Sequence, residues 1–350
     1  MFDMAIAAAI GSAVHVAAHL ASGKYVGFEA FDSFKRTEAE GKVVLERVVD
    51  AGISWTELVP SWNATAPSGG EVVVEVQALR ELGATKFYSF GTWGLEARQS
   101  LPGQKDADGD VLTDTLRMTA PCQSVLVRVT LRGDANLKFL GLCFANTALE
   151  PNQSEPIREA WGKVLDVPAR AQMSYPNGPK ICSPTCVSMI LSYWSHRLGR
   201  PELDREVPEV CAAVDDPNWP GTGNWPFNTA YVGSFEGVRA YVARFSDVSQ
   251  LEAWIAAGVP VATSVAYDIL RFGERKRASD GHLMVLVGFT KEGDPVFNDP
   301  ASTEQVRRVY PRDSFVKAWA ESKRTVYLVY PVGHPVPEDH FGKWFTPPSP

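Results

Sequence analysis

Short runs in which apolar and polar residues alternate dominate the first half of the chain, from about residue 24 to 147. In the clearest run, Val125, Val127 and Val129 alternate with polar neighbours such as Arg128, which is the period-2 pattern of a strand with one face on a core. Three further runs with strand composition cover residues 72–76, 86–93 and 137–144. The pattern predicts a mostly β domain, with a sandwich or jelly-roll as its architecture.

The pattern changes after a polar connection with two prolines at residues 149–158. Residues 184–196 have apolar side chains at the spacing of one helix face. Further helical spacing covers residues 209–214, 234–245 and 250–257, and strand patterns follow at 259–267, 282–289, 294–299 and 326–330. Helices followed by antiparallel strands predict an α+β domain.

These changes divide the chain into three predicted parts. A β-rich accessory domain covers residues 1–155, with its boundary near Glu155, and the α+β domain covers residues 156–335. The Pro-rich end, residues 336–350, is predicted to form an extended tail or strap.

Charge narrows the range of partners. The chain has 34 basic and 41 acidic residues, a net charge of -7, and no polybasic stretch. Because this balance repels phosphate backbones and anionic lipid, neither nucleic acid nor a membrane surface is expected to bind. No apolar run reaches the roughly 20 residues of a membrane-spanning helix, which predicts a soluble protein.

The Ala-rich segment at residues 4–21 resembles the core of a signal peptide in composition. However, Asp3 stands where a positive charge belongs, and no Lys or Arg occurs before Lys24. We therefore prefer to interpret the segment as a buried helix or strand, and the sequence leaves a cytoplasmic and an exported location open.

The five cysteines are too few and too odd in number for a disulfide framework. Cys122 and Cys143 flank neighbouring predicted strands and could pair in an oxidising compartment, although two buried thiols are the preferred interpretation. At least one thiol is expected to be free.

One of these thiols, Cys182, stands directly before a helix-start signal. Ser183 is a good N-cap, and Pro184 suits the first helical position. A thiol at the positive end of a helix dipole has a lowered pKa, which favours the nucleophilic thiolate. Cys186, one turn further on the apolar face, is predicted to be a packed core residue.

A thiolate nucleophile needs a proton partner, and the chain has six histidines. His282 opens a predicted strand after a short polar loop, a place where catalytic groups are commonly mounted. The others lie in the Ala-rich start, in the Pro-rich tail or at the far end of the cysteine's own helix: His15, His19, His334, His340 and His196. His282 is therefore the predicted base.

An acceptor for His282 follows from the direction of the chain. The strand at 282–289 turns at residues 291–294 and returns, which delivers Asp299 toward the end where His282 lies. A carboxylate at that position would orient the imidazole and stabilise its charged form. Asn298 is the competing residue, and Asp299 is preferred.

At these residues the sequence resembles the cysteine peptidase family thirty-nine, whose bacteriocin-processing members cut leader peptides after double glycine. The family pattern is Gln, then Cys-Gly-Pro-Ala opening a helix, Gly-His before a strand, and Asn-Asp-Pro. It is met in order by Gln172, the segments 182–185 and 281–282, and the segment 298–300. The resemblance covers about residues 167–331 and implies a papain-like fold. It also implies that Gln172 is the oxyanion donor, Cys182 the nucleophile, His282 the base and Asp299 the orienting residue.

Two features depart from the best-known members. Ser183 replaces the usual Gly, which adds a side chain beside the nucleophile and could narrow the approach to it. No transporter region accompanies the domain in this sequence, so leader processing is not implied. The first half resembles, more weakly, the β-rich extension of stand-alone family members.

Other motifs point to structure. The loop at residues 104–114 gathers four aspartates, but its spacing lacks the Gly and the closing Glu of an EF-hand, which favours a solvated acidic turn. Trp55, Trp62 and Trp93 could form a sugar-binding platform, but core positions are preferred. No zinc-ligand spacing and no phosphate loop is found, so no metal or cofactor is expected.

The segment at residues 221–227 has no periodicity and carries a large aromatic residue between glycines and a proline. We interpret it as one wall of the substrate cleft, with Trp225 as an apolar contact and Asn224 as a hydrogen-bonding group. The alternative is a loop whose tryptophan covers the core.

The residues thus predict a cysteine peptidase acting on a peptide or protein substrate. Two alternatives stay open. A thiol acyltransferase would use the same residues but pass the acyl group to an amine. A non-catalytic protein would bind a carbohydrate or cell-surface ligand through its first domain.

Overall fold

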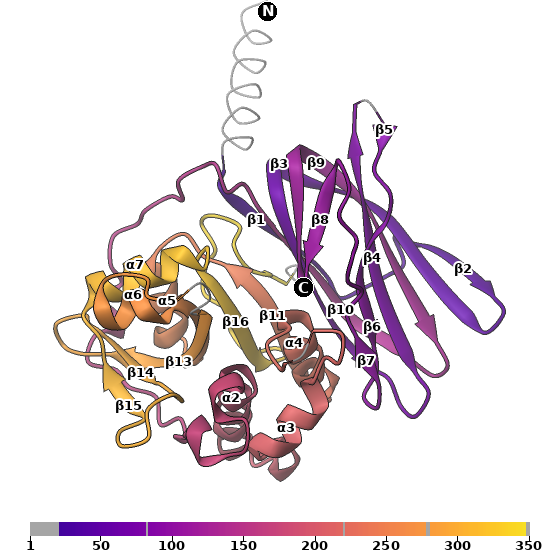
Figure 1. Cartoon of the computed structure of the whole chain (residues 1–350). Coiled ribbons are helices and arrows are strands. Elements are labelled where there is room, and N and C mark those ends of the chain that lie inside the picture. The colour runs from indigo at the N-terminus through magenta and orange to yellow at the C-terminus, as the bar shows by residue number, and fades with distance from the viewer. Residues whose placement is uncertain (1–20, 82, 220, 278–280, 348–350) are drawn as a thin grey trace, which may run out of the picture.

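The computed structural model describes residues 21–347, apart from residues 82, 220 and 278–280 (Figure 1). All but the last residue of the Ala-rich segment 4–21 therefore lies outside the described residues. Two parts lie side by side: a strand-rich region, followed along the chain by a region of mixed helices and strands. The predicted α+β class is confirmed.

The described strands of the first part form one ten-stranded antiparallel sheet. Its central order is β1-β10-β3-β9-β4-β6-β7, with β2 on β3, β5 on β4 and β8 on β9. The strands are β1 (Gly23–Phe28), β2 (Lys35–Ala39), β3 (Lys42–Thr65), β4 (Glu71–Arg80), β5 (Gly83–Ala84), β6 (Tyr88–Trp93), β7 (Arg98–Gln99), β8 (Gly109–Leu112), β9 (Thr115–Arg132) and β10 (Asn136–Ala145).

Alternating burial along these strands follows the sequence pattern. In β4, Val72, Val74 and Val76 are fully buried, whereas Val73 and Glu75 between them are half-buried. The tryptophans considered for a sugar platform are also buried completely: Trp55, Trp62 and Trp93. Because none of them reaches the surface, they form core and cannot present a flat face to a carbohydrate.

The long strands β3 and β9 bend where their register shifts, between Asp50 and Trp55 and again between Trp55 and Glu57. Before the bend β3 also pairs with β2, and beyond it β3 pairs with β10. The observed strand pairing joins all ten strands into one bent sheet. The architecture of a sandwich or jelly-roll stays a prediction.

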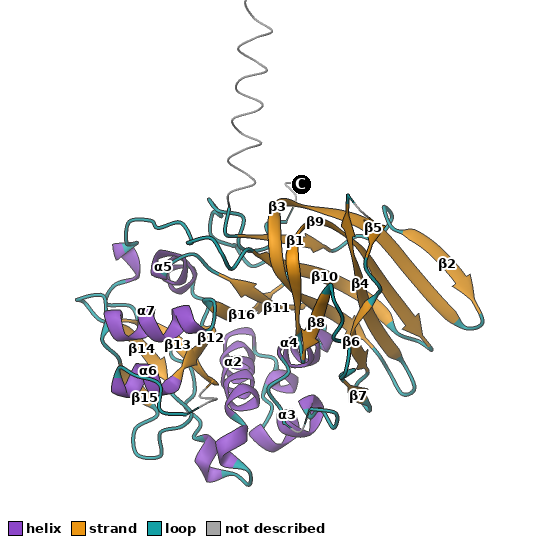
Figure 2. Cartoon of the chain, turned by 45° about the horizontal axis from the view of Figure 1, so that its top comes forward, coloured by secondary structure: helices purple, strands orange, loops and turns teal. Residues whose placement is uncertain are grey.

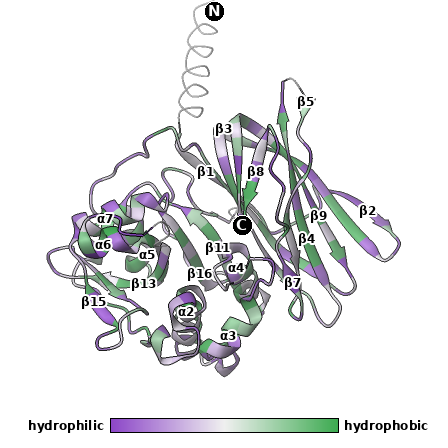
Figure 3. Ribbon diagram, in the orientation of Figure 1, coloured by the Kyte–Doolittle hydropathy of each residue, from purple (hydrophilic) through white to green (hydrophobic). Residues whose placement is uncertain are grey.

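The second part contains a six-stranded antiparallel sheet of order β11-β16-β12-β13-β14-β15, with helices packed around it (Figure 2). Its strands are β11 (Val238–Arg244), β12 (Val261–Ala266), β13 (Gly281–Phe289), β14 (Pro295–Asn298), β15 (Arg307–Val309) and β16 (Thr325–Pro331). Its α-helices are α2 (Cys182–Leu198), α3 (Val207–Val214), α4 (Trp225–Ser234), α5 (Val248–Ala256), α6 (Tyr267–Phe272) and α7 (Arg312–Glu321). β13 is coloured mainly as hydrophobic (Figure 3), and eight of its nine residues are buried.

The helix predicted at residues 234–245 is wrong, because residues 238–244 of this segment form the strand β11. Val238, Tyr241 and Val242 have the spacing of a helix face, but every residue of β11 is buried. A strand buried on both faces has no polar side to mark its period of two, so periodicity alone cannot separate it from a helix.

The absence of regular structure predicted for residues 221–227 is also wrong in part, because α4 begins at Trp225. Asn224 is the N-cap, and its side chain accepts a hydrogen bond from the Phe227 N–H. Pro226 is tolerated in the first turn because the N–H that proline lacks has no partner within the helix there. α4 packs between β3 of the first part and β11 of the second, so its apolar residues join the two parts.

Residues 146–157 connect the two parts without a helix or strand, and the exact domain limits stay a prediction. The end of the chain lies across both parts. Trp344 packs on Trp254 of α5, Phe345 packs on Phe139 of β10, and the Gly342 carbonyl accepts from the Tyr25 N–H. Among the described residues, none of the helices combines the length and apolarity needed to cross a bilayer.

Candidate active site

Cys182 is the first residue of α2 and is half-buried. The preceding Ile181 takes the N-cap position and makes no side-chain hydrogen bond to the helix, so no side chain caps this end. Ser183 is inside the helix, which corrects its prediction as the cap. Its hydroxyl lies 3.0 Å from the Tyr327 hydroxyl of β16, so the serine faces the interior rather than the approach to the sulfur.

The hairpin of β13 and β14 brings His282 and Asp299 to one end of the sheet. The strands pair antiparallel with Val285 opposite Asn298, so the start of β13 and the end of β14 meet. His282 Nε2 lies 2.8 Å from Asp299 Oδ1, and both side chains are buried.

His282 also lies close enough to the Cys182 sulfur for the two groups to shift each other's pKa. Since Nε2 is occupied by Asp299, Nδ1 is the nitrogen left for the sulfur. Burial alone would lower the pKa of His282, but the hydrogen bonds to Asp299 and to Cys182 raise it to about 9. The imidazole is therefore favoured in its charged form at neutral pH.

The two cysteines of α2 have opposite electrostatic environments. Burial would raise the pKa of Cys182, but the hydrogen bond and positive charge of His282 bring it below the ordinary thiol value, helped by the Leu283 and Ser183 N–H groups. Burial raises the pKa of Cys186 well above that value, and its side chain is not exposed at all. Cys186 is thus a packed core thiol.

Asp299 is held by four hydrogen bonds. Oδ1 accepts from His282 and, at 3.0 Å, from the Ala301 N–H, while Oδ2 accepts from the hydroxyls of Tyr267 at 2.9 Å and Tyr310 at 2.6 Å. Burial would raise the pKa of Asp299, but the bond and charge of His282 and the two tyrosine hydroxyls lower it to about 2. The carboxylate is therefore ionised across the physiological range.

Sequence reasoning missed both tyrosines. Tyr267 begins α6, and its ring lies 4.3 Å from the imidazole of His282, centroid to centroid. Tyr310 follows β15. Neither position has a spacing that would reveal its contact with Asp299, because each is brought there by long-range packing.

Asn298, the alternative to Asp299, makes different contacts. Its amide nitrogen donates to the Val167 carbonyl at 3.0 Å, and its amide oxygen accepts from Arg307 Nε at 3.1 Å. The fully buried Asn298 side chain therefore ties the connection before Gln172 to β15, while Asp299 makes the contact with His282.

Gln172 lies in a short 3-10 helix (η2, Gln172–Ser174) and is 3 % exposed. Its N–H donates to the Pro300 carbonyl at 2.8 Å, which links it to the segment that carries Asp299. Its Nε2 donates to the Gly178 carbonyl at 2.7 Å, and an amide nitrogen has a second hydrogen to donate.

The two residues expected to contact substrate, Asn224 and Trp225, differ in how far their side chains are exposed. Asn224 is 1 % exposed and donates to Asp216 Oδ2 at 3.1 Å in addition to capping α4. Both side-chain atoms are thus bonded inside the protein, which favours a capping role for Asn224 over the predicted contact with substrate. Trp225 is half-buried, and its N–H donates to Asp114 Oδ2 at 3.0 Å. Its contact with substrate stays a prediction.

The acidic loop at 104–114 bonds to the protein itself. Asp106 accepts from the Tyr88 hydroxyl at 2.6 Å, and Asp108 pairs with Arg80 at 2.9 Å. Across the described part of the chain, no group of His, Cys, Asp and Glu has the arrangement of a metal site. The five cysteines all fall within this part, and none is in a disulfide.

Comparison with known proteins identifies two family domains in the chain. Residues 164–327 match the Peptidase_C39 like family, and residues 17–138 match the Peptidase C39 N-terminal domain. The first match contains Gln172, Cys182, His282 and Asp299. No curated protein matches the chain.

Two solved structures show weak likeness. A crystal structure described as a C39-like peptidase from Bacillus anthracis is 16% identical, with a TM-score of 0.37, over 48% of this chain and 97% of that one. A structure of the Gt strain of infectious bursal disease virus is 13% identical, with a TM-score of 0.19, over 35% of this chain and 32% of that one. At these identities and TM-scores the two solved structures carry no argument, so the family is shown by the two domain matches. The chain thus combines a domain of the Peptidase_C39 like family with the N-terminal domain that accompanies it.

Proposed function

We propose that this protein is a cysteine peptidase in which Cys182 is the nucleophile, His282 the acid and base, and Asp299 the orienting residue. The observation that carries the proposal is the position of His282, whose Nε2 lies 2.8 Å from Asp299 Oδ1 and whose ring lies close enough to the Cys182 sulfur to lower the pKa of that thiol. The lowered pKa of Cys182 and the raised pKa of His282 favour a thiolate beside an imidazolium.

In the proposed reaction, the Cys182 thiolate attacks the carbonyl carbon of a peptide bond. The carbonyl oxygen becomes an oxyanion, and the second hydrogen of Gln172 Nε2 is the proposed donor to it. As the tetrahedral intermediate collapses, the C–N bond breaks and the His282 imidazolium gives its proton to the leaving amine. A thioester to Cys182 is left.

Deacylation reverses the role of His282. The neutral imidazole takes a proton from water, the resulting hydroxide adds to the thioester carbon, and the C–S bond breaks to regenerate thiolate and imidazolium. Asp299 holds the ring during both steps, and the hydroxyls of Tyr267 and Tyr310 hold Asp299.

Trp225 keeps its proposed role as an apolar substrate contact, because its side chain is partly exposed at the start of α4. On this proposal, Trp225→Ala raises KM or changes side-chain preference while Cys182 still reacts with a small alkylating agent. Unaltered kinetics and specificity in a folded variant would remove it from the cleft.

The test is cleavage of a peptide library by the full chain, with product termini identified by mass spectrometry. The wild type should produce new amino and carboxyl termini that Cys182→Ala does not. If both proteins give the same products, or neither cuts while Cys182 is reduced, the proposed cysteine peptidase with Cys182 as nucleophile is contradicted.

A further inference from the structure

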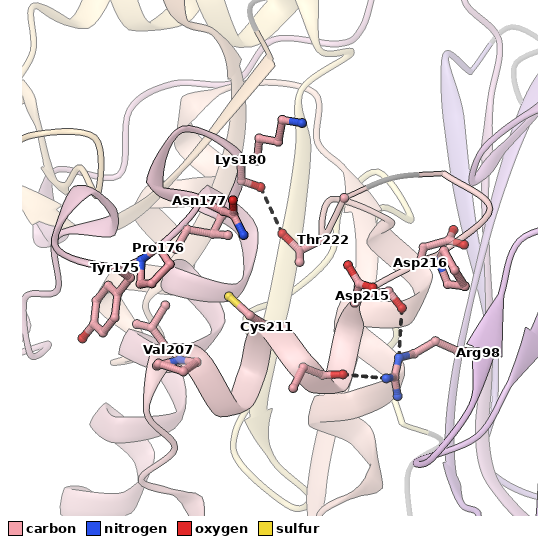
Figure 4. A pocket seen from close by; sticks show the side chains of 15 residues that line it. Arg98, Tyr175, Pro176, Asn177, Lys180, Val207, Cys211, Asp215, Asp216 and Thr222 are labelled. Carbon is pink, nitrogen blue, oxygen red and sulfur yellow. Dashed lines mark hydrogen bonds between the residues drawn. The ribbon is translucent and has the colours of Figure 1, made fainter.

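A cavity of about 640 Å³ opens beside α3 and is lined in part by the loop that follows this helix. We call it the α3 cavity (Figure 4). Its lining includes Tyr175, Ile181, Val207, Cys211, Asp215 and Thr222.

The α3 cavity adjoins the proposed nucleophile along the chain. Lys180 and Ile181, the two residues before Cys182, line it. The Thr222 hydroxyl donates to the Lys180 carbonyl at 3.0 Å, so the loop after α3 is tied to the segment that leads into α2. The cavity therefore borders the segment that carries the proposed nucleophile.

One wall of the cavity is held by the first domain. Arg98 of β7 donates to the Ala212 carbonyl at 2.5 Å and to the Asp215 carbonyl at 3.1 Å (Figure 4). The Ser100 N–H donates to Asp216 Oδ1 at 3.0 Å, and the Ser100 carbonyl accepts from Asn218 Nδ2 at 2.7 Å. Four hydrogen bonds thus fix the end of α3 and the following loop to the N-terminal domain.

The lining has an apolar base and no net charge. Val207 and Ile181 are buried there, next to Cys211, whose pKa burial raises to about 11, so it is a neutral thiol. Arg98 and Lys180 balance Asp215 and Asp216, and the buried Asp216 is occupied by bonds from Ser100, Asn218 and Asn224. Because the charges of the lining sum to zero, the cavity favours a charged side chain of neither sign, whereas an apolar side chain would be removed from water.

We propose that the α3 cavity takes an apolar side chain of the substrate next to the scissile bond, and that the N-terminal domain shapes this subsite through Arg98. The inference rests on the proposed function for its substrate. It assigns the first domain a part in peptide selection, and Arg98 is a positioning residue because it acts through the backbone of Ala212 and Asp215.

The experiment profiles cleavage of a peptide library by the full-length wild type, Arg98→Met and Ala212→Phe. Arg98→Met frees the wall, whereas Ala212→Phe fills the cavity from α3 and leaves the bonds of Arg98 in place. We expect wild type to prefer Leu over Gly at one position beside the cut. Each variant should lose that preference by at least about tenfold in kcat/KM, the scale of one side chain in an apolar pocket.

Arg36→Met is the matched control, because Arg36 lies on the exposed strand β2 and bonds Glu38 of the same strand. Its profile should equal that of wild type, and Cys182 in every variant should react with iodoacetamide at the wild-type rate. An unchanged preference in both test variants would overturn the proposal. A preference for Lys or Arg that disappears in Asp215→Asn would overturn the apolar assignment.

Binding separates this proposal from the peptidase proposal. The Cys182→Ala protein is applied to an array of the same peptides, with and without Ala212→Phe. Selective binding of Leu-containing peptides that Ala212→Phe removes would support the subsite even if wild type cuts none of them. Absence of selective binding would overturn the subsite, whatever the wild type cleaves.

Discussion

Two helix starts in the second domain, those of α2 and α4, use their positive ends in opposite ways. At α4, Asn224 bonds the Phe227 N–H, and Asp114 of the first domain bonds the Trp225 N–H. At α2 no side chain caps the helix, and the group placed there is the thiol of Cys182.

The difference separates a structural helix end from a chemical one. Burial raises the pKa of Asp114 to about 6, despite the bond from Trp225. The Asp114 carboxylate accepts this bond from α4 and so joins the two domains. At α2 the helix end, the Leu283 and Ser183 N–H groups and His282 all favour a negative sulfur. We therefore expect substitution of Cys182 at the start of α2 to change chemistry and removal of the Asn224 cap of α4 to change stability.

The largest effect is expected from the reacting pair. Cys182→Ala and His282→Ala should each reduce kcat/KM by at least about 10⁴-fold, because the thiolate and its proton partner act as one unit. Peptide cleavage followed by chromatography measures this. Cys186→Ala, one turn along the same helix, is the matched control and should keep most activity. Loss of turnover in a folded Cys186→Ala protein would mean that the nucleophile is misassigned.

The next effect is expected at Gln172. Gln172→Ala should lower kcat by about 100-fold to 1000-fold, because a donor to the developing oxyanion is removed. The rate of Cys182 alkylation should change little, which separates loss of the donor from damage to the helix start. Gln153→Ala, at an exposed glutamine of the connection, is the control. A wild-type kcat in Gln172→Ala would exclude it from the site.

A smaller loss and a shift in pH dependence are expected for Asp299→Asn. Burial lowers the pKa of His282, but the bond to Asp299 raises it, so wild-type activity should fall only as the pH rises through about 9. With the carboxylate charge removed, the imidazolium loses its proton at lower pH, so the alkaline limb of the kcat/KM profile should shift to lower pH. The maximal rate should also be roughly 100-fold lower. Asn298→Ala should lower stability without moving that limb. An unchanged profile in Asp299→Asn would favour Asn298 as the orienting residue.

The smallest effect on chemistry is expected at the start of α4. Asn224→Ala should lower the free energy of unfolding by about 0.5–2 kcal/mol through loss of the cap, measured by denaturant titration. Cys182 should be alkylated at the wild-type rate. A stable variant with slowed alkylation would show that the two helix starts are not independent.

The fold was predictable where one face of an element is buried and the other is not. The alternating burial of the valines in β4 is such a case. α2 was predicted from its helical spacing and its start signal, although residues 183–195 are all buried. β11 and α4 were not predictable in this way. β11 is buried on both faces, and α4 begins with Trp225 and Pro226, which were interpreted as part of a loop. Asn224 followed by a proline within the first turn was the signal that could have located α4.

The candidate site was predictable as far as chain direction allows. A strand that turns and returns must bring Asp299 back toward His282, and the structure puts these two side chains in contact. The tyrosines that hold Asp299 and the inward rotation of Ser183 depend on distant segments, Tyr310 and Tyr327 among them. Such contacts follow from tertiary packing and leave no local pattern.

The most direct test of the account is the pH dependence of Cys182 alkylation by iodoacetamide, followed by peptide mapping of the modified thiol. Because the thiolate reacts and His282 stabilises it, the rate in wild type should stay high well below the ordinary thiol pKa of about 8.5. In His282→Ala the rate should fall over the same range. A wild-type Cys182 that reacts only as the pH rises to 8.5 or above, with the same profile in His282→Ala, would contradict the proposed ion pair.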